Sequence, residues 1–171
     1  MFDAQILLKK LEFGRYFVHS SRDDIPNSVT HLLCSGNFTD PIEDCIPKSV
    51  TNLTFYDNYK SELCHKIPAT ITHLTLGQRF SKSACGYIPN SVTHLAFGRK
   101  HTGSIKNCIP SSVTHIAFAK HYGRLIDTLP ETVKYIYVHQ GYTYDVVLSH
   151  AKVLRHTCSL QFRWEDKYLE K

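Results

Sequence analysis

Histidine recurs at one position of an evenly spaced pattern, and this column has the clearest potential for chemistry in the sequence. His31, His73, His94 and His115 are separated by multiples of 21 residues, with Asn52 and Tyr135 completing the series. If the chain makes one coil per 21 residues, these side chains stack about 4.8 Å apart. Neutral imidazole nitrogens commonly bind metals, so a metal-binding scaffold that uses the His column is one hypothesis.

A structural column of partly exposed side chains is the simpler interpretation of these histidines. The histidine belongs to the repeat itself, and no column of carboxylates stands beside it to orient metal ligands. We therefore expect no metal site and no cofactor.

The six cysteines supply the thiols that nucleophilic catalysis would require. Cys45 and Cys108 share one repeat position three units apart, which places them about 14 Å from each other and prevents a disulfide. Cys64 and Cys85 share a position in adjacent units, where a disulfide is feasible. Cys34 occupies a core position, and no zinc-type spacing of cysteines occurs. We expect reduced structural thiols in a reducing compartment, with a Cys64–Cys85 disulfide as the alternative.

A cytosolic enzyme built on a Cys/His pair is the hypothesis from a different functional class. It would use Cys85 or Cys108 with a neighbouring histidine. A catalytic site gathers a nucleophile, a base and an orienting group in one pocket, whereas here these residue types lie at repeated positions. We therefore expect no enzyme and no catalytic residue.

Evenly spaced Ile-Pro dipeptides indicate the structural units that must position the histidine and cysteine side chains. Ile-Pro begins at residues 25, 46, 67, 88 and 109, and Leu129-Pro130 follows 20 residues later. A period this constant indicates stacked structural units. We predict a single solenoid domain over 1–171, with a degenerate first repeat at 4–24. Full repeats follow at 25–45, 46–66, 67–87, 88–108, 109–128 and 129–146, and a C-terminal cap at 147–171.

Apolar residues recur at fixed positions within each unit. In the unit that begins at Ile88 they continue with Val92, Leu95, Phe97 and Ile105, with a lapse at His101. The spacing L-x-x-L-x-L is typical of leucine-rich-repeat strands. We predict a mainly β repeat solenoid, a leucine-rich-repeat-like right-handed coil with a parallel sheet on the concave face. Short irregular or 3-10 segments should form the convex side.

The C-terminal residues depart from the repeat and are expected to cover the end of the stack. A stack of parallel strands ends in unpaired backbone that needs protection. The segment SHAKVLRHT, residues 149–157, is compatible with a helix. Residues 160–164 alternate like a strand.

The motif IPNSVTHLAFG at 88–98 resembles that of FNIP repeats, a family related to leucine-rich repeats. Such repeats occur in social amoebae and in giant DNA viruses of amoebae, and the resemblance covers residues 8 to about 142. The family's F-N-x-P-L segment is matched best at 38–42, although its asparagine is replaced in every unit. The resemblance implies a protein-binding solenoid, and we expect a viral or host adaptor. Many viral members carry an F-box, which is not expected here because the first rung begins within ten residues.

Charge and hydropathy narrow the choice of partners and location. The net charge of +5 favours acidic partners, but no Lys/Arg run exceeds two residues, so nucleic acid is not an expected partner. No leader-like start and no long apolar run occurs, which argues against a membrane. We expect a cytoplasmic protein, or one in the host cytoplasm if a virus encodes it.

The repeat is broken on its exposed face in the last unit, where two tyrosines replace the usual histidine and small residue. The candidate partner-binding residues are His94, His115, Tyr135, Tyr137, His139, Arg99, Lys100 and Lys120. Exposed aromatics fringed by cations are typical of protein-binding hot spots. We predict that a protein partner binds here, on the concave face. The alternative is that Tyr135 and Tyr137 pack under the C-terminal cap.

Overall fold

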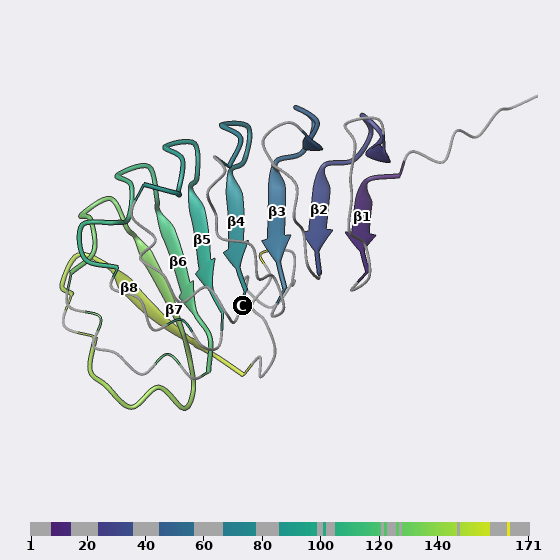
Figure 1. Cartoon of the computed structure of the whole chain (residues 1–171). Helices are drawn as coiled ribbons and strands as arrows, with labels where there is room; N and C mark the ends of the chain where they lie inside the picture. Colours follow the sequence, from purple (N-terminus) through teal and green to yellow (C-terminus); the bar gives the residue numbers. More distant parts are fainter. Residues whose placement is uncertain are drawn as a thin grey trace, which may run out of the picture.

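Eight short strands form one parallel sheet in which neighbours in sequence are neighbours in space (Figure 1). The computed structural model describes residues 8–14, 24–35, 45–56, 67–77, 86–98, 101, 105–120, 122, 126, 128–146, 148–157 and 164. The strands are β1 (Lys10–Phe13), β2 (His31–Cys34), β3 (Asn52–Phe55), β4 (His73–Leu76), β5 (His94–Phe97), β6 (His115–Phe118), β7 (Tyr135–His139) and β8 (Lys152–His156). Their order in the sheet is β1 to β8 without crossovers, as expected for a solenoid.

Each strand pairs with the next in the register set by the repeat. His94 lies opposite His115 and Leu95 opposite Ile116, and equivalent pairs connect β1 to β7. Because side chains alternate along a strand, Leu95 and Phe97 enter the core while His94 and Ala96 lie on the opposite face. The predicted strand positions and register are therefore confirmed.

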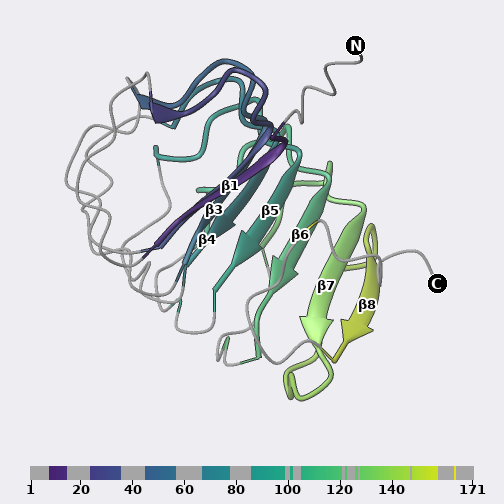
Figure 2. The ribbon, with the colours of Figure 1, turned by 90° about the vertical axis from the view of Figure 1, so that its right-hand side faces the viewer.

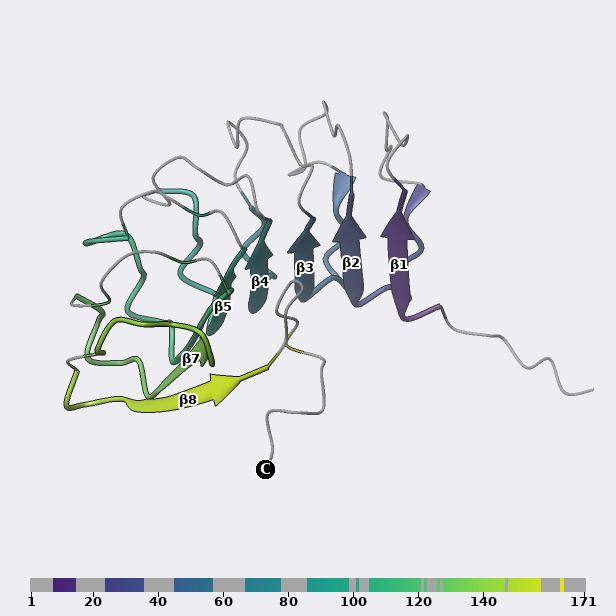
Figure 3. The same ribbon diagram turned by 90° about the horizontal axis from the view of Figure 1, so that it is seen from below.

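The sheet is curved, and its inner face carries the His column. Figure 3 shows β1 to β4 in a row from which β7 and β8 turn away, and Figure 2 shows the strands side by side along one face of the coil. The core side chains of the strands pack against buried residues of the return segments, such as Tyr122 and Ile126. The fold is thus the predicted leucine-rich-repeat-like β-solenoid. Among the described residues there is no helix with the length and apolar character required to span a bilayer.

A tight turn begins each coil at the proline. The N–H of Val92 donates to the carbonyl of Pro89 at 3.1 Å, and the same bond recurs after the other five repeat prolines. Ser91 then donates its hydroxyl to the carbonyl of Ile71 in the preceding coil at 2.7 Å. Proline has no N–H and a fixed φ, so it suits this unpaired corner.

Aromatic rings fill the space behind the strands. Phe97 and Phe118 stack with centroids 5.6 Å apart, and Tyr122 packs on Phe118 at 4.4 Å. His101, a lapse in the apolar pattern, is 1% exposed and stacks on Phe97 at 4.5 Å. The His101 ring therefore packs in the core as an aromatic side chain would, although a polar residue type does not predict this burial. Tyr122 and Tyr142 occupy the position of His101 in the next two coils, and both are buried.

The expectation of a helix at 149–157 is wrong, because β8 occupies residues 152–156. The edge of β7 presents unpaired backbone groups, and β8 satisfies them in parallel register from Tyr135↔Lys152 to His139↔His156. The Lys152 N–H donates to the Lys134 carbonyl at 2.8 Å. Pairing at an open edge therefore outweighs the helical preference of this segment. The strand predicted at 160–164 lies outside the described residues except for Trp164, which is in a turn.

We predict that Leu95→Ala lowers the free energy of unfolding by about 3 kcal/mol, as expected for a large-to-small change in a close-packed core. Leu95 is fully buried in the core cluster. Urea denaturation measures the change, with exposed Lys120→Ala as the near-neutral control. A Leu95→Ala protein that unfolds like the parent would contradict the register of β5.

Gly77 is expected to tolerate no side chain. A Cβ added there would lie 2.8 Å from the carbonyl oxygen of Phe55, too close for unrelaxed backbone. Gly77→Ala should therefore lower the free energy of unfolding by about 1–3 kcal/mol, as overpacking does. Gly14→Ala is the control because nothing lies within 4 Å of its added Cβ. Equal melting temperatures for the two variants would show that the coils are not this closely spaced.

Candidate functional site

The predicted His column exists and is a continuous stack of rings. Successive centroids from His73 to His94 and from His94 to His115 are 4.2 Å apart, and Tyr135 follows His115 at 4.8 Å. The interplanar angles are 15°, 10° and 18°. The parallel strands impose this spacing, because each ring occupies the same place in its coil.

A threonine before each histidine orients the ring. The Thr93 hydroxyl oxygen lies 2.9 Å from Nδ1 of His94, and the same Thr–His contact recurs at 2.8–2.9 Å in the other His-bearing coils. In the one coil with asparagine, Thr51 donates to Oδ1 of Asn52 at 2.9 Å. The repeated Thr-His pair therefore positions the column and occupies Nδ1 of each ring.

The environment of the column favours neutral imidazoles. Burial lowers the pKa of His94 to about 3, and the neighbouring His73 and His115 contribute further. Burial also lowers the pKa of His115, with a smaller effect from the charge of Lys134. His94 and His115 are consequently uncharged at neutral pH, and the stacked rings present their edges to the concave face.

A second column runs beside the first on the same face and differs in size from strand to strand. Its members in β5 and β6 are Ala96 and Ala117, both fully buried, and in β7 it continues with Tyr137. These three residues form a cluster separate from the main core, against which Trp164 packs. We call the group of Ala96, Ala117, His94, His115 and Tyr137 the aromatic seat.

Trp164 occupies the aromatic seat with its ring nearly perpendicular to the rings around it. Its ring centroid lies 4.9 Å from that of His94, 6.4 Å from that of His115 and 5.8 Å from that of Tyr137. The interplanar angles are 81°, 86° and 82°, which is the T-shaped geometry that aromatic pairs favour. Sequence reasoning missed Trp164 as a site residue, although it is the single tryptophan of the chain.

The structure brings together some of the predicted partner-binding residues and separates others. His94, His115 and Tyr135 form the half-buried stack, whereas Tyr137 is 7% exposed and lies against Trp164. His139 is buried, accepts a hydrogen bond from the Gly141 N–H at 2.9 Å and lies beside His156. Lys120 is exposed in the turn after β6, and Arg99 and Lys100 lie outside the described residues.

The stacked geometry explains why the column makes a poor metal site. In parallel rings the nitrogen lone pairs point in similar directions and do not converge on one point, as metal coordination requires. No group of three or more His, Cys, Asp or Glu that is suited to holding a metal ion occurs in the part of the chain that the structure describes.

The cysteines differ from the expectation of six reduced thiols. Cys34 and Cys45 are free and buried, and burial raises the pKa of Cys34 to about 12, so its thiol is unreactive. Cys108 is disulfide-bonded, which corrects the expectation for this residue and removes it as a nucleophile. Cys64, Cys85 and Cys158 lie outside the described residues, so the Cys64–Cys85 disulfide stays a prediction.

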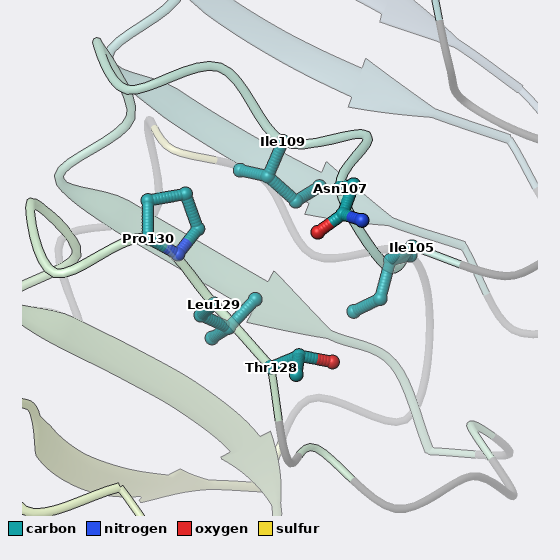
Figure 4. Close-up of a pocket in the computed structure, with 6 residues that line it drawn as sticks. All are labelled: Ile105, Asn107, Ile109, Thr128, Leu129 and Pro130. Atoms are coloured by element: carbon teal, nitrogen blue, oxygen red, sulfur yellow. The ribbon is translucent and has the colours of Figure 1, made fainter.

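A cavity of about 350 Å³ opens where the repeat is one residue short (Figure 4). Ile105, Asn107 and Ile109 face Thr128, Leu129 and Pro130, which lie about one repeat later in the sequence. Asn107 adopts a left-handed φ of 58°, which asparagine tolerates better than most residues. The described lining contains no ionisable side chain, so this cavity offers no acid, base or nucleophile.

We predict that His94 titrates far below the ordinary histidine pKa of about 6.5. Because the unfolded chain binds the proton and the folded chain does not, stability should fall as the pH drops from about 6.5 toward 3. Two-dimensional NMR of the imidazoles measures the pKa directly.

His73→Asn provides the matched variant, since Asn52 already fills the equivalent place in β3. Removing one imidazole neighbour should raise the pKa of His94 while preserving the hydrogen bond from threonine. A His94 that titrates near 6.5 in both proteins would show that the column is not buried as described.

The comparisons with known proteins agree with this architecture. The FNIP repeat family matches residues 21–57, 38–79, 65–100 and 85–121, which together cover more than half of the chain. A solved structure described as a novel circular LRR protein, CroV588, is similar with a TM-score of 0.61 and 26% sequence identity. The similarity covers 77% of this chain but only 21% of CroV588. No curated protein matches significantly. The in-register Ile-Pro corners, the Thr-His strands and the family match together show that this chain belongs to the FNIP repeat family.

Proposed function

We propose that this chain is a non-enzymatic protein-interaction module, a viral or host adaptor that binds a protein partner on the concave face of its solenoid. The observation that carries the proposal is the stack of His94, His115 and Tyr135. These rings are uncharged, partly exposed and held rigidly by the strands. A rigid aromatic side chain loses little conformational entropy when a partner binds, and aromatic residues are enriched in hot spots.

Charge near the stack favours an acidic partner. Lys134 precedes β7 and Lys120 follows β6, and both side chains are exposed. Cations at the margin of a binding surface accelerate association with an acidic protein more than they strengthen the complex. The net charge of +5 acts in the same direction.

We further propose that the repeats and the C-terminal residues 147–171 act as one domain. The cytoplasm, or the host cytoplasm for a viral chain, is the location we propose. Buried thiols at Cys34 and Cys45 fit this location, whereas the disulfide at Cys108 is the observation against it.

Capture of the partner from a lysate of the producing or host cell tests the binding proposal. Tyr135→Ala should weaken binding of the captured protein by about 2 kcal/mol or more, as loss of a hot-spot residue does. Lys120→Ala should mainly slow association. Quantitative mass spectrometry of the captured proteins, followed by titration of the purified partner, measures both effects.

Asn52→Ala is the matched control, because Asn52 occupies the same column four strands from Tyr135. A genuine partner should be retained by the Asn52 variant and lost by the Tyr135 variant. If every protein captured by the parent is captured equally by the Tyr135 variant, the C-terminal part of the concave face is not the binding surface.

A further inference from the structure

The aromatic seat is shaped by two alanines that interrupt a column of larger side chains. The equivalent residue is Thr75 in β4, Tyr137 in β7 and Leu154 in β8. Ala96 and Ala117 are register partners, so their small side chains lie together and leave room above the sheet. An aromatic ring set there contacts the alanine floor and the His94, His115 and Tyr137 rings around it.

Capping of the solenoid does not account for Trp164 in this seat. The exposed end of the sheet is covered by β8, which pairs along the whole of β7. Trp164 instead lies on the face of the sheet, over β5, β6 and β7. Its ring contacts the concave-face side chains of His94, His115 and Tyr137.

We propose that the aromatic seat is the binding site for a tryptophan side chain presented by the protein partner, and that Trp164 occupies it in cis until the partner displaces it. This inference rests on the proposed function, because the seat shares His94 and His115 with the stack described above. The indole ring lies perpendicular to its aromatic neighbours, an arrangement that aromatic pairs favour, and the two alanines leave room for it.

The tether gives Trp164 an advantage over any external ligand. A side chain on a short linker acts at an effective concentration in the millimolar range. A partner must therefore compete with Trp164 for the seat. The partner's apparent affinity equals its affinity for the open seat multiplied by the fraction of molecules whose seat is open. Removal of Trp164 should then raise the affinity for a tryptophan-bearing peptide by on the order of tenfold or more.

The chain's own C-terminal sequence provides a defined probe. The peptide of residues 159–171 carries the tryptophan and its natural neighbours, and fluorescence anisotropy of a labelled copy measures binding in trans. The Trp164→Ala full chain should bind this peptide at least tenfold more tightly than the parent does. The same peptide with tryptophan replaced by alanine should not bind.

Two variants in the Trp164→Ala background separate the seat from non-specific adhesion. Ala117→Leu fills the floor of the seat and should abolish peptide binding. Thr54→Leu adds bulk to the same column two strands from Ala96, and binding should persist. Equal binding by these two variants would overturn the assignment of the seat.

The parent protein offers a readout that needs no variant, since Trp164 is its single tryptophan. Excess peptide in which phenylalanine replaces tryptophan should displace Trp164, shift its emission to longer wavelength and increase its quenching by acrylamide. The alanine peptide should change neither. This measurement keeps the proposal falsifiable even if Trp164→Ala fails to fold.

Three further results would overturn the inference. One is a folded Trp164→Ala protein that binds the peptide no better than the parent. Another is Trp164 emission that is unchanged at saturating phenylalanine peptide. The third is a parent dimer that becomes monomeric on Trp164→Ala, because Trp164 would then fill the seat of a second copy. None of these results changes the outcome of the capture experiment with the Tyr135 variant. That experiment tests the proposed function separately from the tryptophan-binding seat.

Discussion

The hydrogen bonds between successive coils are the constraint on which the rest of the structure depends. The carbonyl of Thr72 accepts the N–H groups of both Thr93 and His94, at 2.9 and 3.1 Å, and the same pairing recurs between the other His-bearing coils. This bond pattern admits one register, in which equivalent residues lie directly above one another. Aromatic stacking at 4.2 Å, the continuous core and the shared concave surface all follow from it.

Repetition gives this surface an electrostatic character that a single histidine would not have. A lone exposed imidazole is partly protonated near neutral pH, but neighbours in a column disfavour one another's charge. Burial adds to this effect, most strongly at His94. The concave face therefore offers uncharged rings in its centre, while cations such as Lys120 and Lys134 remain in solvent at its margin.

Departures from the repeat decide where this surface becomes specific. A uniform column would present identical sites along the stack, whereas Ala96 and Ala117 create one place with room for a large ring, and Tyr137 bounds it. The occupant is supplied by a part of the chain beyond the last strand. In this repeat scaffold the identical contacts between coils provide rigidity, and the few positions that differ provide selectivity.

The sequence by itself determined the strands, their register and the His column, because a repeat in phase encodes contacts between equivalent positions at a constant spacing. The tertiary structure alone decided the features that involve unlike segments. Residues 152–156 form β8 instead of a helix, because the unpaired backbone groups at the edge of β7 bond to this strand. The tertiary structure also placed His101 in the core against Phe97, and Trp164 over the two alanines. Such contacts join residues with no shared period, and only the folded coil brings them within reach.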